Sequence, residues 1–563
     1  MKKLAILFVA SLSATAYAQQ PLFIPDTLSG TVFNLTMHND SVQFLPGSKT
    51  ATMAFNINAY LGPTLIMQKG TTVNITVNNQ IGDTTNIHWH GFHVAPTNDG
   101  PRQNIMPGMN WNPQFQIMND AATYWYHPHL HMKTALQALR GAAGLIIVKD
   151  NAEAALTLPR RYGIDDFPIV AQSMQFDLQN QIDERGMEDS ILLVNGTLNP
   201  FLNVPAQVVR MRLLNASGER NFNFGFSANK SFYVIGNDGG LLSAPAATTR
   251  IRLSPGERAE ILLDLSGMNG QTLYLMSYAS ELPMGVQGGP TMSMPGGPPM
   301  NSPLNGINFN MLQLNVGPQT TSPVTTIPST LIPQTPLHPS QANVTRNIRF
   351  TADNMMVMDG PFYFNDSSYN ENRIDYKIPL NNIEIWELDN QTMVAHPFHI
   401  HDVQFGILSI NGVAPTAKEA GKKDVIMVPP MEIVKFITKF EDFADSTTPY
   451  VYHCHILMHE DDGMMGQFLV MPPGSLDVQS IIAESGISIY PNPATDQLTI
   501  KVEEYTKGEF YEIQVKDLFG RVIYEIDTKA TAVTINTSAW NRGLYLITIA
   551  AEDKKLSKKI LLQ

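Results

Sequence analysis

The histidines of this chain gather in four short motifs whose spacing suits metal binding. Ten of the 14 histidines fall in HWH at 88–90, HPH at 127–129, HPFHIH at 396–401 and HCHILMH at 453–459. Residues i and i+2 of an extended strand face the same side, so each His-x-His pair can reach one metal. A single pair would be weak evidence, but four pairs in one chain are hard to explain by packing.

The chain has one cysteine, Cys454, and it lies between two of these histidines. A lone cysteine is most often a small buried hydrophobic residue. On a strand, however, His453 and His455 would face one metal cluster while Cys454 faces a different metal. Two sites joined by so short a covalent path would suit electron transfer.

The ligand types around Cys454 favour copper. One thiolate, two imidazoles and a distant thioether are the ligands of a blue-copper electron-transfer site. Candidates for these four ligands are Cys454, His459, Met464 and His396. Zinc is the main competitor, but zinc seldom uses a thioether and usually takes more cysteines.

Short β-prone segments punctuated by Gly, Pro and Asn must position these motifs. Examples are residues 72–82, 208–217, 259–267 and 381–390. Regularly spaced short strands predict an all-β fold of sandwiches or barrels. A chain of 563 residues is too long for one core, so we expect three or four domains, with boundaries near 155, 325 and 480.

The N-terminus and the charge limit where the protein acts. Residues 1–18 combine two lysines, an apolar stretch and a small-x-small ending, which predicts a secretory signal peptide. No later apolar run of about 18 residues predicts a transmembrane segment. The net charge of −13 argues against nucleic acid as a partner.

The four motifs, in this order, resemble those of the multicopper oxidases, the laccase and bacterial copper-oxidase group. The resemblance runs from about residue 25 to 473 and includes GPTLIMQKGTTVNITVNN and GNDGGLL…LSPGERAEILLDL. It implies three cupredoxin-like Greek-key β-sandwich domains, at 19–155, 156–325 and 326–480. A small β-sandwich domain would follow at 481–563.

The resemblance also implies four copper ions per chain and a role for each ligand. A type 1 copper would be held by His396, Cys454, His459 and Met464, and a type 2 copper by His88 and His399. The type 3 pair would be held by His90, His127 and His455 on one copper and His129, His401 and His453 on the other. Cys454 would then relay electrons inward, and the activity would couple four one-electron oxidations to the reduction of O2 to water.

Reduction of O2 also consumes protons, which need an acid near the cluster. Asp99 and Glu460 match acidic positions that the family uses for proton supply, although by themselves they could be solvated loop carboxylates. His93 and His131 lie beside ligand motifs, where we expect supporting roles. Asp402 follows HPFHIH where many relatives have glycine, and the sequence offers no reason for it.

The electron donor stays open between phenols or aromatic amines and Cu(I). Thioethers favour Cu(I), and methionines recur in the Gly/Pro-rich loop 283–305 and at 355–358; candidate contacts are Met292, Met294, Met355 and Met358. The alternative is a merely flexible loop. Cuprous oxidases commonly place Asp and Met before the blue-copper histidine, where this chain has Thr392 and Val394, with Met393 out of register.

The methionines leave a dedicated cuprous oxidase for copper tolerance as an alternative, although the residues before His396 do not match that class. Some relatives have lost their metals and act without catalysis, so a non-enzymatic copper-binding protein is a lesser alternative. Copper nitrite reductases share the fold but lack the full set of eight trinuclear histidines.

The C-terminal segment resembles the sorting domains of type IX secretion. YPNPA at 490–494 and the GLY…KK ending carry the resemblance. It implies the type IX machinery as a partner, and passage through the periplasm to the cell surface or the medium. The alternative is a small accessory β-sandwich on a periplasmic protein.

Overall fold

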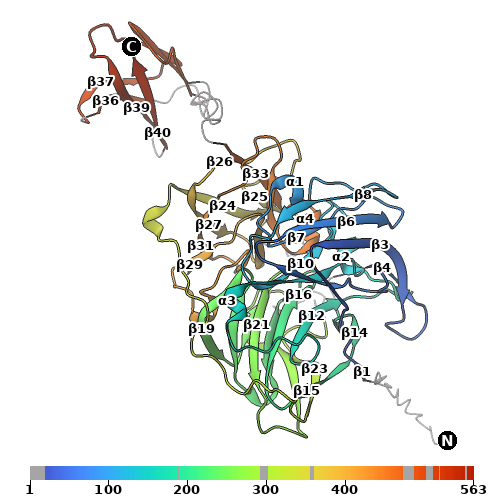
Figure 1. The fold of residues 1–563 in the computed structure, drawn as a ribbon. Helices are drawn as coiled ribbons and strands as arrows, with labels where there is room; N and C mark the ends of the chain where they lie inside the picture. The colour runs from blue at the N-terminus through green and yellow to red at the C-terminus, as the bar shows by residue number, and fades with distance from the viewer. Residues whose placement is uncertain are drawn as a thin grey trace, which may run out of the picture. The chain divides into compact units, whose positions relative to one another are not determined.

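The structure is a computed structural model. It describes residues 19–186, 189–291, 302–354, 360–472, 487–502, 511–518, 520–551 and 554–563, so the expected signal peptide lies outside the described residues. The chain divides into two compact units, Met1–Val470 and Met471–Gln563. The expected all-β fold is confirmed, since each unit is built from sheets paired into sandwiches (Figure 1).

The first sandwich pairs a five-stranded sheet with a smaller one. The larger sheet runs in the order β2 (Thr27–Ser29), β5 (Thr64–Gln68), β11 (Gly144–Lys149), β10 (Ala122–His127) and β7 (His88–His90). The facing sheet runs β4 (Thr50–Phe55), β3 (Val32–Val42), β6 (Thr72–Gln80) and β8 (Asn110–Trp111), with β9 (Gln114–Gln116) also paired to β6. In β6 the alternation of apolar and polar residues buries Val73, Ile75 and Val77 in the core.

The second sandwich is the largest. One sheet runs β1 (Gln20–Pro21), β15 (Pro200–Pro205), β23 (Asn308–Gly317), β22 (Thr272–Tyr278), β17 (Phe222–Phe226) and β20 (Ile251–Leu253). The other runs β14 (Thr197–Leu198), β13 (Ile191–Val194), β12 (Asp166–Met174), β16 (Val208–Asn215), β21 (Arg258–Asp264), β18 (Phe232–Asn237) and β19 (Gly240–Thr248).

Strand β16 is buried on both faces because its sheet also meets the first sandwich. Val209, Met211 and Leu213 belong to the core of the second sandwich. The alternate residues Arg210 and Arg212 face the first sandwich, where Arg210 pairs with Glu153 at 2.8 Å and Arg212 donates to Thr123. Buried ion pairs of this kind fix the contact between the two sandwiches.

The third sandwich carries two of the histidine motifs. One sheet runs β25 (Phe362–Phe364), β24 (Val344–Ala352), β27 (Ile383–Asn390), β31 (Ile433–Lys439) and β29 (Gly406–Ile410). The other runs β26 (Tyr376–Pro379), β33 (Met465–Met471), β32 (Tyr450–Cys454), β28 (His396–Ile400) and β30 (Val425–Val428).

Helices are short in the described residues. They are α1 (Pro96–Asp99), α2 (Thr134–Leu139), α3 (Asn151–Ala154) and α4 (Leu457–Asp461), with 3-10 turns at Ser227–Asn229, Ala279–Glu281, Pro339–Gln341 and Ala417–Glu419. Two of them join the first and third sandwiches, since the backbone N–H groups of Thr134 and Ala135 in α2 donate to Asp461 in α4 at 3.0 Å. None of the described helices is long and apolar enough to cross a membrane.

The C-terminal unit has a core of its own. A three-stranded sheet, β34 (Ile487–Tyr490), β35 (Gln497–Val502) and β38 (Ala532–Asn536), pairs with a four-stranded one, β37 (Val522–Thr528), β36 (Tyr511–Asp517), β39 (Gly543–Ala551) and β40 (Lys554–Leu562). Leu498, Val515 and Ile547 pack between them. This unit therefore has the small β-sandwich expected of the tail.

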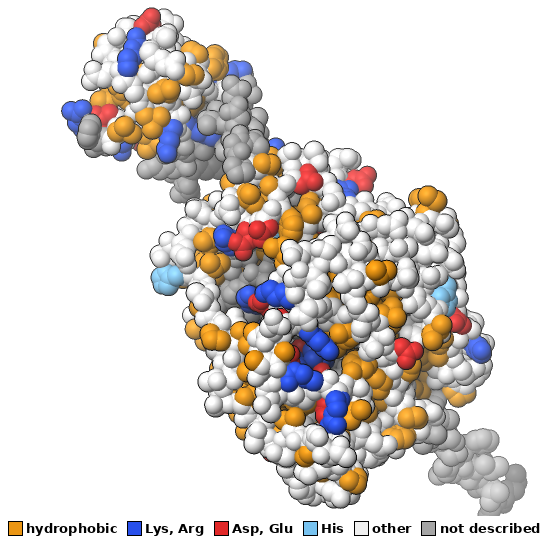
Figure 2. Space-filling view, in the orientation of Figure 1, with side chains coloured by type: hydrophobic (Ala, Val, Ile, Leu, Met, Phe, Trp, Pro, Cys, Tyr) orange, Lys and Arg blue, Asp and Glu red, His pale blue; other side chains and the backbone are white. Residues whose placement is uncertain are grey.

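The surface carries interleaved charges. On the face drawn in Figure 2, Lys and Arg side chains lie in small groups, several of them beside Asp and Glu. The pairing of both Lys69 and Lys422 with Asp120 illustrates this arrangement. Exposed pairs of this type contribute little stability each.

Candidate metal centre

Two pairs of neighbouring strands bring the histidine motifs together. In the first sandwich β7 pairs with β10, so that His88 lies opposite His127. In the third sandwich β28 pairs with β32, so that His399 lies opposite His453. The residues between the ligands face the other way, as Trp89 does in the core of the first sandwich.

Eight histidines meet between the first and third sandwiches and are buried. They form three groups whose ring nitrogens lie within 4.8 Å of one another: His90, His127 and His455; His129, His401 and His453; and His88, His399 and His401. In the first group His90 Nδ1 lies 3.3 Å from His127 Nε2. In the second, His129 Nε2 and His401 Nε2 lie 3.0 Å and 3.3 Å from His453 Nε2.

Backbone carbonyls fix the outward nitrogen of several of these rings. His88 Nδ1 donates to the carbonyl of Asp99 at 2.9 Å, and His399 Nδ1 donates to that of Asp424 at 2.7 Å. His127 Nδ1 donates to the carbonyl of Pro128 at 2.8 Å. A proton held on one nitrogen leaves a lone pair on the other, which is how proteins orient metal-binding imidazoles.

The inward nitrogens fit a metal. Buried polar atoms normally have a hydrogen-bond partner. Nε2 of His88, Nε2 of His399 and both nitrogens of His455 are buried without one. Burial lowers the pKa of His90 and His399 well below the usual value, and neighbouring histidines lower it further, so these rings are neutral and able to ligate.

A second, smaller group lies inside the third sandwich. Cys454 Sγ is 3.6 Å from His396 Nδ1 and 3.5 Å from His459 Nδ1, and all three residues are buried. Thr392 Oγ1 lies 2.9 Å from the other nitrogen of His396, which holds that ring in place. Burial raises the pKa of the Cys454 thiol, so binding a metal there would release a proton.

Met464 lies beside this group. Its side chain is buried in the core of the third sandwich, and its carbonyl accepts the N–H of Cys454 at 3.0 Å. Its own N–H donates to the carbonyl of His459 at 2.8 Å. A thiol, two imidazoles and a neighbouring thioether suit copper.

Cys454 and its flanking histidines serve different groups, as the sequence predicts for a strand. Cys454 packs in the core of the third sandwich with His396 and His459 nearby, whereas His453 and His455 belong to two of the three buried histidine groups. The covalent chain therefore runs from one candidate metal site directly to the other.

Asp99 and Glu460 are both buried against candidate ligands and are not solvated. Asp99 Oδ2 lies 2.7 Å from His401 Nδ1. Glu460 lies 3.4 Å from His129 Nδ1 and 3.2 Å from His453 Nδ1, and it accepts from the hydroxyl of Thr134 at 2.6 Å.

The electrostatics of Glu460 favour its ionised form. Burial alone would raise its pKa, but the fields of His129 and His453 more than offset burial and hold the pKa well below its usual range.

The structure explains why an aspartate can occupy position 402. Its backbone has a φ of 70°, in the left-handed region where glycine is at ease and aspartate is among the better-tolerated residues. Its carboxylate lies 2.8 Å from His93 Nδ1, and the other nitrogen of His93 lies 3.0 Å from Asp442. His93 therefore joins the first sandwich to the third.

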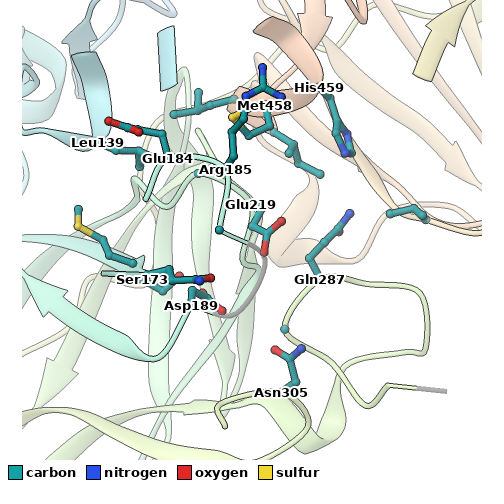
Figure 3. A pocket seen from close by; sticks show the side chains of 18 of the residues that line it. Leu139, Ser173, Glu184, Arg185, Asp189, Glu219, Gln287, Asn305, Met458 and His459 are labelled. Carbon is teal, nitrogen blue, oxygen red and sulfur yellow. The ribbon is translucent and has the colours of Figure 1, made fainter. Parts of the chain in front are cut away.

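A cavity of about 370 Å3 opens beside the smaller group (Figure 3). His459, which is 8% exposed, lines it together with Met174, Met393, Met458, Gln287 and Glu219. Met393, which is out of register with the methionine of cuprous oxidases, thus lines the same cavity as His459. Met292, Met294, Met355 and Met358 lie outside the described residues.

Glu219 differs from Asp189 and Asp462, two other carboxylates of this cavity. Asp189 is paired with Arg220 at 2.6 Å and Asp462 with Arg185 at 2.9 Å. Within the described part of the chain, Glu219 has no ion pair. Burial, with a contribution from Asp189, raises the pKa of Glu219 to about 8.

Sequence reasoning missed three supporting residues: Glu219, Thr392 and Asp424. Asp424 Oδ1 lies 3.2 Å from His90 Nε2, and 334 residues separate the two. Thr392 is only four residues from His396, so a hydroxyl this close in the sequence to a candidate ligand could have pointed to it. Glu219 sits outside every motif, and no pattern in the sequence singles it out.

Known families match nearly the whole chain. The multicopper oxidase family matches at residues 36–153, 154–291 and 334–474. A secretion system C-terminal sorting domain matches at residues 488–563, so the chain ends in a domain of that family.

Individual relatives include multicopper oxidases and a cell division protein. The multicopper oxidase mco of Staphylococcus epidermidis is 32% identical over 448 residues, which is 78% of this chain and 88% of the relative. The solved structure of a laccase-like multi-copper oxidase, CueO, from Ochrobactrum sp. is 32% identical, covers 80% of this chain and all of its own, and superimposes with a TM-score of 0.70. The cell division protein FtsP of Escherichia coli is 30% identical over 470 residues, 82% of this chain and 94% of the relative.

Proposed function

The chain belongs to the multicopper oxidase family, and we propose that it oxidises a small reducing donor one electron at a time and reduces O2 to water. One observation carries the proposal: Cys454 lies in the smaller candidate metal group, while its neighbours His453 and His455 belong to the larger cluster. A copper-binding protein does not need such a link. An enzyme that takes up electrons at one metal site and uses them at another needs it.

We infer four copper ions per chain. The type 1 copper would be held by His396, Cys454 and His459, with Met464 as the weak axial ligand. The type 2 copper would be held by His88 and His399, and the type 3 pair by His90, His127 and His455 and by His129, His401 and His453. When bound, the coppers would supply four one-electron carriers, which matches the four electrons that O2 needs.

The cavity beside His459 would receive the donor. The copper that His459 and Cys454 would hold supplies a one-electron acceptor there, and His459 Nδ1 lies 3.5 Å from Sγ, so one imidazole separates a donor in the cavity from that acceptor. The Cys454 side chain and backbone would provide the path from it to His453 and His455.

Glu219 supports phenols and aromatic amines as donors. Removing an electron from a phenol makes its O–H strongly acidic, so the proton must go to a base as the phenoxyl radical forms. Glu219 lines the same cavity as His459 and has no ion pair among the described residues, so once the pH rises toward its pKa of about 8 its carboxylate can take that proton.

Asp99 and Glu460 would relay protons for the reduction of O2, each taking up a proton and passing it on. Both carboxylates are buried and touch outward nitrogens of candidate ligands, Asp99 at His401 and Glu460 at His129 and His453. A carboxyl held there can deliver a proton to the cluster without displacing a ligand.

Cu(I) is the second candidate donor. Met174, Met393 and Met458 line the cavity that His459 also lines, and thioethers favour Cu(I) over harder ions. Cu(I) brings no proton with it, so Glu219 would have no acid–base role in its oxidation.

The deciding experiment is O2 consumption by the copper-loaded enzyme with a phenol, an aromatic amine and Cu(I), each also tested with Glu219→Gln and Met393→Leu. The phenol hypothesis expects Glu219→Gln to slow only the first two donors. The Cu(I) hypothesis expects Met393→Leu to slow only the third. A copper-loaded chain that consumes no O2 with any donor would instead be a non-enzymatic copper-binding protein.

We also propose that the sorting domain directs export through the type IX system to the cell surface or the medium. Fractionation of cells that express the full chain and a chain ending at residue 480 tests this. Export of the shorter chain would contradict the proposal, and its retention in the periplasm would support it.

A further inference from the structure

The second sandwich supplies none of the candidate copper ligands, yet two of its residues reach the larger histidine cluster, which is the proposed type 2 and type 3 (trinuclear) copper site. Arg258 begins β21 and is 0% exposed. Gly256 lies two residues earlier and packs directly against His455. A fully buried guanidinium beside a metal site calls for a reason, because burying a charge is costly unless it is paired.

Arg258 uses all five of its N–H donors. Nη1 and Nη2 bind the two oxygens of Asp424 at 2.5 Å and 2.6 Å, a bidentate pair. The remaining donors go to the carbonyls of Thr123 at 3.1 Å, Gly256 at 3.1 Å and Asp238 at 2.9 Å. Thr123 belongs to the first sandwich and Asp424 precedes β30 in the third, so one side chain is anchored to all three.

Asp424 in turn touches two candidate ligands. Its Oδ1 lies 3.2 Å from His90 Nε2, and its carbonyl accepts from His399 Nδ1 at 2.7 Å. A carboxylate fixed at Nε2 holds the proton of His90 there and leaves the lone pair on Nδ1, which faces His127 at 3.3 Å.

We propose that Arg258 is a positioning residue of the trinuclear copper site. By holding Asp424 with two parallel hydrogen bonds, it sets the ring orientation and tautomer of His90 and the position of the carbonyl that orients His399. The inference rests on the proposed function, because it assumes that these histidines bind copper.

Two glycines leave the space in which Arg258, Asp424 and the candidate ligands come together. A Cβ added to Gly91, the glycine of HWHG, would lie 2.4 Å from Asp424 Oδ2 and 2.7 Å from Arg258 Nη2. A Cβ added to Gly256 would lie 2.8 Å from the ring of His455. Both glycines thus leave room for the second sandwich to reach the ligands.

An arginine that only stabilises the contact between sandwiches would form a similar ion pair without affecting copper binding. Arg212 provides such a comparison. Arg212 is also buried in the second sandwich and binds Asp166 through two N–H groups at 2.8 Å each. It also reaches the first sandwich through the hydroxyl of Thr123 at 3.0 Å. Its side-chain partners Asp166, Glu260 and Thr123 are not candidate ligands, so Arg212→Lys serves as the control for Arg258→Lys.

The test uses the full-length holoenzyme of the wild type, Arg258→Lys and Arg212→Lys. Copper is withdrawn by a graded chelator while bound copper, blue absorbance and the EPR spin count are followed, together with thermal unfolding. Lysine keeps the charge but cannot form the fork. We expect Arg258→Lys to release its trinuclear copper at about 10- to 100-fold lower chelator, with the blue colour kept, because that is the usual effect of losing a partner of a ligand.

Arg212→Lys should unfold at a lower temperature yet release copper as the wild type does. Equal copper release by Arg258→Lys and the wild type would overturn the positioning role. If Arg258→Lys does not fold, Asp424→Asn removes the carboxylate that Arg258 holds and takes its place with the same expectations. A wild-type chain that binds only one copper would contradict the proposed function instead.

Discussion

Cys454 Sγ lies 3.5 Å from Nδ1 of His459, and His459 also lines the cavity at the edge of the third sandwich. One imidazole therefore separates a small molecule in that cavity from the thiol. This relationship makes Cys454 the residue on which both colour and turnover should depend.

Replacing Cys454 with serine should abolish the blue absorbance and O2 consumption together. Serine is similar in size, but its hydroxyl is a hard ligand and cannot replace the soft thiolate that a blue-copper electron-transfer site needs. Visible absorbance, copper content and O2 uptake measure the outcome. A variant that stays blue and active would show that electrons enter by another route, and circular dichroism checks that the fold is kept.

Glu219 should make phenol oxidation depend on pH. Its pKa is raised to about 8 by burial and Asp189, so the carboxylate that accepts a proton becomes available only as the pH rises toward 8. We expect kcat/KM for a phenol to rise over this range in the wild type and to be lower and flatter in Glu219→Gln. Ferrocyanide, a donor without a proton to lose, is the control, and an equal change with both donors would rule out proton acceptance.

Glu460 should govern proton delivery to the O2 site. Glu460→Gln keeps the shape of the side chain but cannot cycle a proton, so turnover should fall about 100-fold or more. Anaerobic bleaching of the blue colour by the donor should keep its rate, because it needs no proton at the cluster. Asp120→Asn, at an exposed pair, is the control; slow bleaching in Glu460→Gln would point to damage at the donor side.

His93 should stabilise the contact between the first and third sandwiches in a pH-dependent way. Burial lowers its pKa, but Asp402 and Asp442 more than offset this and raise it to about 9 from the ordinary 6.5. A raised pKa in the folded state means that the stabilisation is fully present below pH 6.5 and is lost as the pH rises through about 9.

Thermal unfolding of wild type and His93→Gln across this range provides the measurement. The difference in midpoint between the two should be largest at the acid end and should shrink as the pH approaches 9. A difference that is constant or grows with pH would mean that His93 stays neutral in the folded protein.

The sequence predicted the strands and the gathering of the ligand motifs because both depend on local patterns. The alternation of β6 and the expected strands at 208–217 and 381–390 appear as β6, β16 and β27. The His-x-His spacing follows from the period of a strand, which is why the sequence alone assigns His453 and Cys454 to different sides.

What the sequence could not predict depends on contacts between distant segments. Asp424 meets His90 across 334 residues, and Arg258 meets Asp424 across 166. The backbone of Asp402 has a positive φ that no sequence pattern announced. Glu219 owes its raised pKa to burial, with a contribution from Asp189, and both depend on the folded chain.

The two candidate metal sites differ in how many sandwiches build them. His396, Cys454 and His459 all belong to the third sandwich, whereas the larger cluster takes ligands from the first and the third. The smaller site therefore needs ligands from the third sandwich alone. The larger one needs the first and third sandwiches in contact, so each ion bound there would add its binding free energy to their interface, and the apo protein should be easier to unfold than the loaded one.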